Sequence, residues 1–245
     1  MRYTANVQVR SYEVGADGLL HHAHIARFVL HAGNLVTNAL GMGAAWYEAE
    51  GTFFVVRGLH MEFESGARED ETLTLTTWLS NARRVRGHRE VGLASAADGR
   101  AIANAQLDWV YVDRATLGPA RMPADMIERL KLEEAHACRE AWALGQPTGE
   151  SSEALRAAQH HELDQLQHLN SAVYVEWFEQ AWCEATGRVP ADIRGHQLEY
   201  LRQVMLGEPM RIVTQATDTG VWSQEIRQAD TGELRARNWL AARRD

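Results

Sequence analysis

The sequence has few cysteines and no long hydrophobic run. Only two of its 245 residues are cysteines, Cys138 and Cys183, and they lie in unrelated contexts. This scarcity argues against a disulfide framework or a zinc site and fits a reducing compartment. No stretch reaches the roughly 18 apolar residues that a membrane span needs, and the N-terminal segment lacks the apolar core of a secretory signal. We therefore expect a cytoplasmic protein with no membrane span.

Several motifs that define protein classes are also missing. The sequence contains no G-x-S-x-G nucleophile elbow, no P-loop and no G-x-G-x-x-G after a strand, which removes the serine-hydrolase route and two common nucleotide-binding loops. Acidic residues outnumber lysine and arginine by 33 to 25, and the net charge of −8 argues against nucleic-acid binding. Nothing completes a zinc motif around the dense histidines, so we predict no metal and no cofactor. These histidines are His21, His22, His24 and His31.

The segment 144–153, LGQPTGESSE, has the composition of a linker, because it combines glycine, proline and small polar residues without hydrophobic periodicity. A charged, helix-favouring segment precedes it, from about Pro123 to Trp142. The linker composition predicts two domains. They are an N-terminal domain of residues 1–140 and a C-terminal domain of residues 155–245, joined by a linker of residues 141–154.

Both halves contain one long apolar helix pattern. In residues 22–40 and again in residues 171–186, apolar side chains recur at helical spacing, and Gly41 and Gly187 are typical helix ends. The segment RGLHMEF (57–63) is repeated as RGHQLEY (194–200). Alternating strand patterns with turns at Asp98-Gly99 and Thr231-Gly232 follow each copy. These strands are predicted at residues 72–79, 86–95 and 105–113, and at residues 210–217, 221–229 and 236–243.

A lone apolar helix needs a surface on which to bury its stripe, and a curved antiparallel sheet supplies one. Each half is therefore predicted to be a long central helix wrapped by an antiparallel meander. This is an α+β hotdog fold, present in tandem. A repeat of two units closes as an internal pseudo-dimer.

The segment before the second helix contains the best candidates for catalysis. Asp164 and His168 lie four residues apart, and Asn170 follows at the expected helix mouth, where backbone amides are unpaired. A carboxylate and an imidazole near free amides are able to activate water and polarise a thioester carbonyl together. Taken alone, Asn170 and Ser171 are typical helix caps, and a single histidine is more often structural. The three groups together favour the catalytic interpretation.

Nearly the whole chain resembles the acyl-carrier-protein (ACP) thioesterase family, the tandem hotdog thioesterases best known from plants. RSYEVGAD (10–17) looks like the opening of that family, and ELDQLQHLNSAVYVEWFE (162–179) looks like the signature before its second helix. In that signature an Asp, an Asn and a His follow in alternate positions. The resemblance places Asp164 at the Asp position and His168 at the His position, and Asn170 matches the asparagine that follows. It implies a fatty acyl thioester hydrolase whose first half shapes the acyl pocket.

The sequence departs from the family pattern at three positions. Leu166 replaces the Asn between Asp164 and His168, Gln203 stands where the family has an acidic residue, and Val204 where plant members have a cysteine. A glutamine orients water but cannot take its proton, so the role of base falls on Asp164, with His168 and Gln203 orienting water or the leaving thiolate. Aligning Ala23 with Ala172 gives the first half Gly15 and Leu19 at the positions of Asp164 and His168.

An arginine cluster in ARRVRGHRE (82–90) is predicted to dock an anionic carrier, either ACP or coenzyme A, because guanidinium groups bind phosphate bidentately. Its members are Arg83, Arg84, Arg86 and Arg89. The alternative is a plain solvated hairpin. Two other functions stay open: a hotdog dehydratase of hydroxyacyl thioesters and a non-catalytic acyl-binding module. The choice between carriers, the acyl chain length and dimerisation also stay open.

Overall fold

The computed structural model describes residues 1–138 and 142–243, and the chain divides into two compact units. Unit 1 is Met1–Arg139 and unit 2 is Glu140–Asp245. The predicted domain boundary at residue 140 and the first residue of the predicted linker, 141, lie outside the described residues. No helix in the described ranges is long and apolar enough to cross a membrane.

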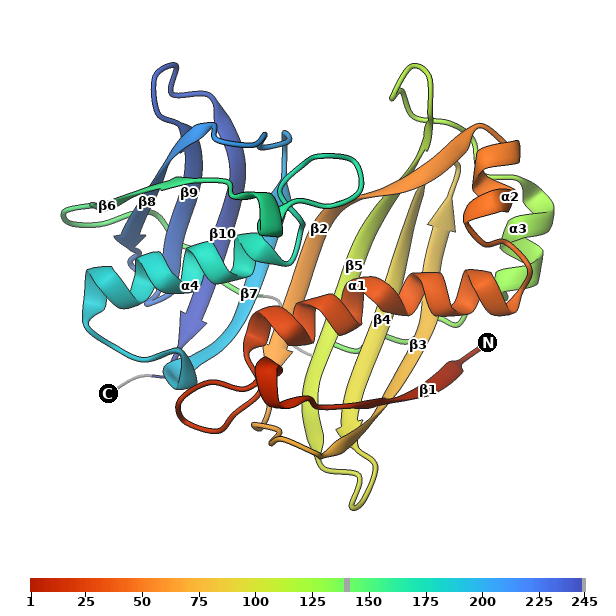
Figure 1. Cartoon of the computed structure of the whole chain (residues 1–245), viewed down its shortest axis with the longest axis horizontal. Coiled ribbons are helices and arrows are strands. Elements are labelled where there is room, and N and C mark those ends of the chain that lie inside the picture. The colour runs from red at the N-terminus through yellow and green to blue at the C-terminus, as the bar shows by residue number, and fades with distance from the viewer. Residues whose placement is uncertain (139–141, 244–245) are drawn as a thin grey trace. The chain divides into compact units, whose positions relative to one another are not determined.

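Unit 1 is an antiparallel sheet with one long helix, α1, lying across it (Figure 1). Its strands are hydrogen-bonded in the order β1-β3-β4-β5-β2. The described elements are β1 (Tyr3–Gln8), the 3₁₀ turn η1 (Ser11–Glu13), α1 (His22–Ala39), α2 (Ala44–Ala49), β2 (Thr52–Phe63), β3 (Thr72–Arg83), β4 (Arg86–Ser95), β5 (Ala101–Asp113) and α3 (Ala124–Leu130).

Unit 2 repeats this plan with the helix α4 across a sheet of order β7-β10-β9-β8-β6 (Figure 1). Its described elements are β6 (Ser152–Ala157), η2 (His160–Glu162), α4 (Val173–Thr186), η3 (Pro190–Asp192), β7 (Ile193–Tyr200), β8 (Pro209–Ala216), β9 (Trp222–Gln228) and β10 (Leu234–Ala242). Read from the edge strand, β6-β8-β9-β10-β7 has the connectivity of β1-β3-β4-β5-β2. The predicted α+β tandem hotdog fold is confirmed.

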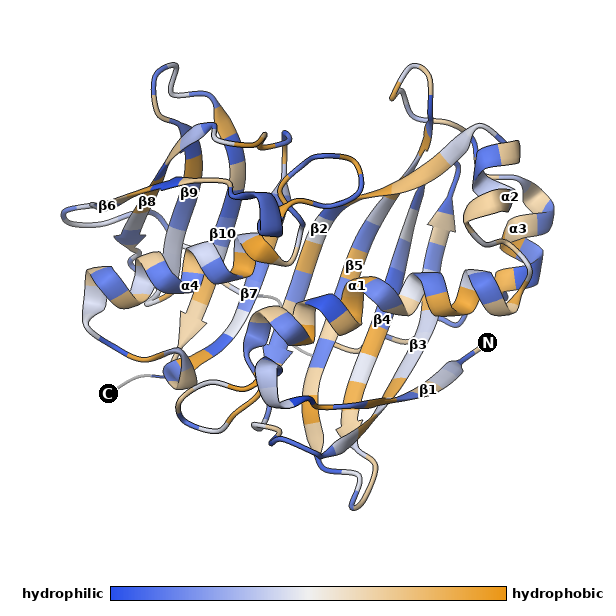
Figure 2. Ribbon diagram, in the orientation of Figure 1, coloured by the Kyte–Doolittle hydropathy of each residue, from blue (hydrophilic) through white to orange (hydrophobic). Residues whose placement is uncertain are grey.

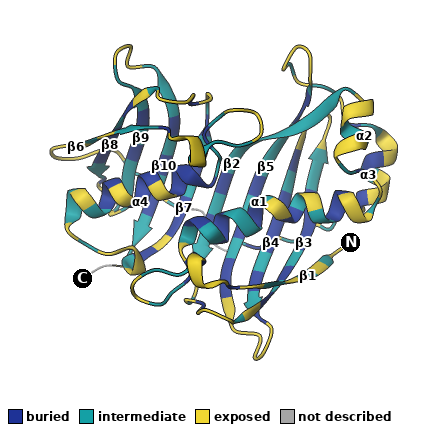
Figure 3. Ribbon diagram, in the orientation of Figure 1, coloured by how far each residue is buried: buried dark blue, intermediate teal, exposed yellow. Residues whose placement is uncertain are grey.

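The predictions of the two long helices and of the two hairpin turns are confirmed. The pattern over residues 22–40 forms α1, and the pattern over 171–186 forms α4, which ends at Gly187 with a φ of 69°. Gly99 and Gly232 both have positive φ at the predicted hairpin turns, at 74° and 72°. The burial pattern along α1 and α4 follows the predicted apolar stripes, and hydropathy alternates along the strands (Figures 2 and 3).

Three elements escape the sequence patterns. β1 and β6 are edge strands without a buried residue, and β6 begins inside the predicted linker at Ser152. α2 is a short helix without a buried residue. Each buries too little surface to leave an apolar period in the sequence, because a strand paired on one side or a two-turn helix rests on neighbouring elements for its stability.

The helix expected from Pro123 to Trp142 is much shorter, since α3 ends at Leu130 and Lys131 adopts a φ of 47°. The chain beyond it bonds to the sheet of unit 1 instead of continuing the helix. The amide of Glu133 donates to the Leu79 carbonyl at 2.9 Å, and the Trp78 indole donates to the carbonyl of Ala135 at 2.8 Å. Backbone groups that a helix satisfies internally are here satisfied by the sheet.

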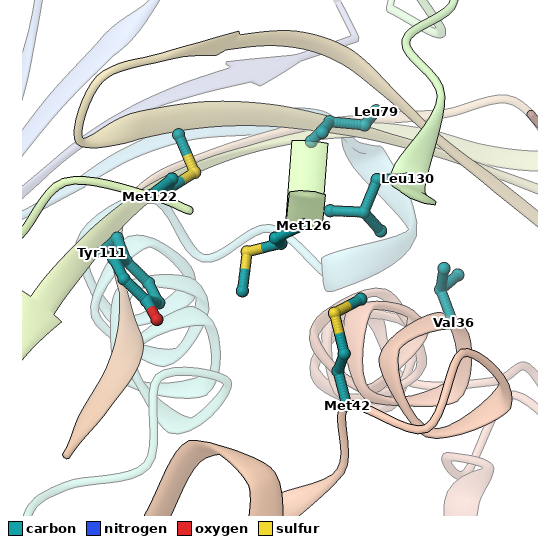
Figure 4. Packing of buried hydrophobic residues seen from close by; sticks show 7 residues of the cluster. All are labelled: Val36, Met42, Leu79, Tyr111, Met122, Met126 and Leu130. Atoms are coloured by element: carbon teal, nitrogen blue, oxygen red, sulfur yellow. The ribbon is translucent and has the colours of Figure 1, made fainter. Parts of the chain in front are cut away.

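An apolar cluster joins α1, α2 and α3 in unit 1 (Figure 4). Tyr47 and Phe54 are partly buried residues that pack against it. The buried members of the cluster are Val36, Met42, Leu79, Tyr111, Met122, Met126 and Leu130. Three of these seven are methionines, whose flexible side chains fill irregular spaces.

Candidate active site

The loop before α4 holds Asp164 in a tight, hydrogen-bonded turn. Leu163 and Leu169 form an isolated antiparallel bridge, and the Asp164 amide donates to the His168 carbonyl at 2.8 Å. Gln167 closes the turn in the left-handed region, with a φ of 64°. A non-glycine residue rarely adopts this conformation, so the surrounding hydrogen bonds fix the loop against its cost.

One oxygen of the Asp164 carboxylate serves the loop and the other does not. Oδ1 accepts hydrogen bonds from the amides of Leu166, at 2.8 Å, and His168, at 3.3 Å. Among the described residues, no hydrogen-bond donor to Oδ2 is found. Asp164 is half-buried, and two backbone amides hold its carboxylate through Oδ1. The Asp164 carboxylate therefore stabilises the loop through Oδ1, while Oδ2 has no such role in the loop.

The segment 203–205 lies beside the same loop. Leu169 donates its amide to the carbonyl of Val204 at 2.9 Å, and His168 forms an isolated bridge with Met205. Gln203 is exposed at the start of this pairing. The structure therefore brings the predicted residues Asp164, His168 and Gln203 to one region of unit 2.

Asn170 holds the turn that leads into α4, whose N-cap residue is Ala172. Its Oδ1 accepts a hydrogen bond from the amide of Ala172 at 2.9 Å, and its own carbonyl accepts from Val173 at 2.9 Å. The Asn170 side chain therefore stabilises the turn before the helix and does not cap α4 itself.

Two buried tyrosines lie beside this helix start. Tyr200 donates its hydroxyl to the Ser171 carbonyl at 3.0 Å, and its ring packs against Tyr174 edge to face, with centroids 5.3 Å apart. Burial raises the pKa of both phenols well above the usual value, and the negative charge of Asp164 adds to this for Tyr174. Both therefore stay protonated, as hydrogen-bond donors at neutral pH.

A buried polar network in unit 2 was missed by the sequence analysis. Nε2 of His196 lies 2.9 Å from Oε1 of Glu179, and its Nδ1 lies 3.1 Å from Nδ2 of Asn238. Asn238 donates in turn to Gln224, whose amide donates to the Phe178 carbonyl at 2.8 Å. Two sequence features could have revealed this network. His196 stands where the internal repeat has the apolar Leu59, and Glu179 interrupts the apolar stripe of α4.

The predicted arginine cluster does not lie on one surface. Arg83, Arg84 and Arg86 are exposed, whereas Arg89 is 5% exposed and lies inside unit 1. The prediction was wrong for Arg89 because alternation along β4 turns it to the inner face, between Leu79 and Leu107.

Two arginines line a pocket of about 360 Å³ at this end of unit 1. One is Arg84, from the predicted cluster, and the other is Arg121, which had no sequence pattern around it. Met122, Pro123, Ala124 and Ile127 complete the lining. Arg86 is instead engaged with Asp108 across the outer face of the sheet.

One group of ligand-type side chains lies within unit 1. The candidate ligand atoms of His60, Glu62 and Cys138 are all within 4.8 Å of one another. Burial raises the pKa of the Cys138 thiol and lowers that of the His60 imidazole, and the charges of Glu62 and Glu90 further oppose a thiolate. A neutral thiol is a poor metal ligand, so this set favours a packed polar cluster over a metal site.

The comparisons with known proteins agree with this architecture. A family model described as the acyl-ACP thioesterase N-terminal domain matches residues 1–130. No curated protein matches the chain.

Three solved structures are similar over nearly all of both chains. An acyl-ACP thioesterase from Bacteroides thetaiotaomicron has a TM-score of 0.83 at 17% identity, covering 99% of this chain and 98% of its own. A putative oleoyl thioesterase from Lactobacillus plantarum has a TM-score of 0.82 at 16% identity, with coverages of 100% and 98%. A 12:0-ACP thioesterase from Umbellularia californica has a TM-score of 0.74 at 16% identity, with coverages of 99% and 97%. Because the family model covers more than half of the chain, this protein belongs to the acyl-ACP thioesterase family.

Proposed function

We propose that this protein hydrolyses fatty acyl thioesters carried on ACP or coenzyme A, with Asp164 as the general base. The observation that supports the proposal best is the carboxylate of Asp164. Its Oδ1 is fixed by two loop amides, and Oδ2 is left to act on a ligand. A base held in one orientation abstracts a proton without first losing rotational freedom.

In the proposed reaction, Oδ2 of Asp164 takes a proton from water as the water oxygen attacks the thioester carbonyl carbon. The C–S bond then breaks, the thiolate leaves and accepts a proton, and a free fatty acid remains. His168 and Gln203 orient the water or the leaving thiolate. Direct attack by Asp164 is the alternative, in which an anhydride forms and water then cleaves it. Neither route needs a metal or a cofactor.

The pocket lined by Arg84 and Arg121 supports docking of an anionic carrier. Two guanidinium groups beside an apolar lining suit a phosphate attached to an organic arm, as in coenzyme A and in the prosthetic group of ACP. Arg83 lies next to Arg84 and is exposed. In this proposal these three arginines contribute to carrier affinity and take no part in bond cleavage.

One observation favours a hotdog dehydratase instead. The imidazole of His196 and the carboxylate of Glu179 form a close pair, which is the acid–base combination such enzymes require. The pair is buried, however, and Nδ1 of His196 is already engaged by Asn238. Proton transfer to a substrate needs access that these contacts do not offer, so hydrolysis is the better-supported reaction.

A thiol-release assay tests the proposal. Acyl-ACP and acyl-CoA substrates over a range of chain lengths should release free thiol and fatty acid in equal amounts. Formation of an enoyl thioester from a hydroxyacyl substrate, without thiol release, would establish the dehydratase. Binding of acyl thioesters with no turnover on either carrier would establish a non-catalytic acyl-binding module.

A further inference from the structure

The connection between β7 and β8, residues 201–208, lies against the loop that precedes α4. The amide of Leu169, in that loop, donates to the carbonyl of Val204 at 2.9 Å. His168 forms an isolated antiparallel bridge with Met205. The loop and the connection therefore support each other, and the position of the loop depends on what holds the connection.

Arg235, near the start of β10, holds this connection at both ends. Its carbonyl accepts hydrogen bonds from the amides of Leu201, at 2.9 Å, and Arg202, at 3.0 Å. Its guanidinium forms an ion pair with Glu208, and both side chains are only 17% exposed. Glu208 in turn accepts the amide of Met205 through Oε2 at 3.0 Å. One residue of the sheet thus fastens the beginning and the end of the connection.

The ion pair is part of a small charged network. Oε1 of Glu208 faces Nη2 of Arg235, and Oε2 is left for the backbone amide. Nη1 of Arg235 lies 3.2 Å from Oε2 of Glu233, whose other oxygen lies 2.8 Å from Nε of Arg202. A single exposed ion pair contributes little to stability, whereas a carboxylate held by two charge-assisted hydrogen bonds keeps one orientation. The network therefore gives the connection a fixed geometry.

The matching residue of unit 1 is Ile102. Its carbonyl accepts the amides of Glu64, at 2.9 Å, and Ser65, at 3.3 Å, which is the pair of contacts that Arg235 makes with the residues after β7. The side chain of Ile102 is fully buried. The fold therefore accepts an apolar side chain at this position, and the arginine is a feature of the unit that contains the proposed base.

Unit 1 pairs the corresponding glutamate with a different arginine. Glu71 accepts a backbone amide of its own turn through Oε2, as Glu208 does, and its Oε1 lies 2.6 Å from Nη2 of Arg100. Arg100 is 39% exposed, against 17% for Arg235. A surface arginine thus suffices for the turn itself, so the more buried arginine of unit 2 is not required by the turn alone.

The geometry of unit 1 indicates what the connection decides in unit 2. Gly66 and Gln203 each precede the residue whose carbonyl accepts the loop amide, so the two positions correspond. A Cβ on Gly66 would lie 2.7 Å from Cδ2 of Leu19, which the alignment of the two helices matches with His168. These two positions are therefore side-chain neighbours, and in unit 2 they hold Gln203 and His168.

We propose that Arg235, acting through Glu208, is a positioning residue for thioester hydrolysis in unit 2. It holds the connection against the loop and thereby sets how Gln203 and His168 lie beside the proposed base. The inference rests on the proposed function, in which these two side chains orient water or the leaving thiolate. Arg235 itself does not touch the reacting atoms.

The kinetic test removes the guanidinium and keeps an apolar stem. In Arg235→Met, kcat for thiol release should fall roughly 10–100-fold, because a small misplacement of orienting groups has an effect of that size. KM should stay near the wild-type value. Arg235→Lys keeps a positive charge beside Glu208 and should recover part of kcat. Arg100→Met, the matched change in unit 1, should keep the wild-type kcat.

A double variant tests whether Arg235 acts through Glu208. If it does, Arg235→Met combined with Glu208→Gln should lose no more of kcat than the more damaging single variant, because both changes break one interaction. Losses that multiply in the double variant would mean that Arg235 acts by another route, and would contradict the inference.

Amide hydrogen exchange gives a readout that does not depend on catalysis. In Arg235→Met the amides of Leu169 and Met205 should exchange faster, because the connection that protects them is released. The amides inside the strands of unit 2 should keep their protection, which separates local loosening from global unfolding. Arg100→Met should leave all of these amides as in the wild type. Unchanged exchange at Leu169 and Met205 in Arg235→Met would overturn the inference.

The kinetic outcomes also separate this inference from the proposed function. If the wild type releases thiol and Arg235→Met is as active as Arg100→Met, the inference is wrong and the proposed function stands. A raised KM at constant kcat would also overturn the inference, because Arg235 would then bind the carrier. If the wild type releases no thiol from either carrier, the proposed function falls, and the catalytic role of Arg235 falls with it.

Discussion

The loops that precede α1 and α4 share a backbone hydrogen bond but differ in the side chain at its donor residue. Gly15 donates to the Leu19 carbonyl at 2.8 Å in unit 1, as Asp164 does to His168 at the same distance in unit 2. A side chain at Gly15 would meet the ring of His21 at 2.9 Å. The alignment puts the smaller Asn170 at the position of His21 in unit 2. The same backbone geometry therefore presents a glycine in unit 1 and, in unit 2, the carboxylate that we propose as the base.

The interiors of the two units differ in how their buried polar groups are paired. Beneath α4 lies a connected polar network around His196, which has partners on α4 and on neighbouring strands. The matching residue in unit 1, Leu59, is apolar, and the charged residue Arg89 lies without a network nearby. His196 of unit 2 thus has hydrogen-bond partners on both of its ring nitrogens, whereas Arg89 of unit 1 has one long hydrogen bond among the described residues.

The largest effect on activity is expected from a substitution in the loop before α4, compared with one in the loop before α1. Asp164→Asn keeps the size and the Oδ1 hydrogen bonds of the side chain but removes its basicity, so thiol release should fall by roughly 10²–10⁴-fold. Asp17→Asn is the matched change in unit 1, where Oδ1 of Asp17 accepts from the Leu19 amide at 3.0 Å, and activity should persist.

Thermal unfolding of both variants separates catalysis from capping. If Asp164→Asn lost about 1 kcal/mol of stability and kept its activity, Asp164 would be only a cap. Equal damage from Asp17→Asn would mean that the active site is assigned to the wrong unit.

The next effect is a loss of folding stability when a buried tryptophan of unit 2 is removed. Trp182, a residue of α4, is fully buried, so Trp182→Ala should lower the free energy of unfolding by about 3–5 kcal/mol, which urea denaturation measures. A loss below about 1 kcal/mol would show that Trp182 contributes little to the packing of unit 2.

A smaller effect is expected at the arginine pocket. Replacing Arg84 and Arg121 by Glu should raise KM for acyl-ACP about tenfold at low salt and less at high salt, because screening weakens the attraction. The turnover number should be unchanged. Arg211→Glu, on the sheet of unit 2, is the control. An identical KM at low ionic strength would leave the pocket without a role in docking.

The smallest expected effect is an increase in folding stability. Gly33 lies within α1, and a Cβ there would make only ordinary contacts, at 3.6 and 3.8 Å from Arg89. Gly33→Ala should therefore stabilise unit 1 by about 0.5–1 kcal/mol through the higher helix propensity of alanine. Calorimetric unfolding checks this. A marked loss of stability would mean that Arg89 cannot tolerate the methyl group and that the region is already full.

The sequence by itself determined the two helices, most of the strands and the tandem plan. Hydrophobic periodicity and turn residues encode these elements locally. Apolar side chains recur at helical spacing in residues 22–40, and Gly99 and Gly232 occupy turns that need positive φ. The loop residues Asp164, His168 and Asn170 could also be proposed as a site from the sequence, because a helix start gathers side chains that are already close along the chain.

Only the tertiary structure decided which charged residues face inward. Arg83, Arg84, Arg86 and Arg89 read as one basic cluster, yet strand alternation and pairing bury the last beneath α1. His196 gathers its partners from separate strands and from α4, at sequence separations that no local pattern encodes. Register and helix placement are collective outcomes of packing, so a side chain whose environment depends on them is assigned only once the sheet and the helix have come together.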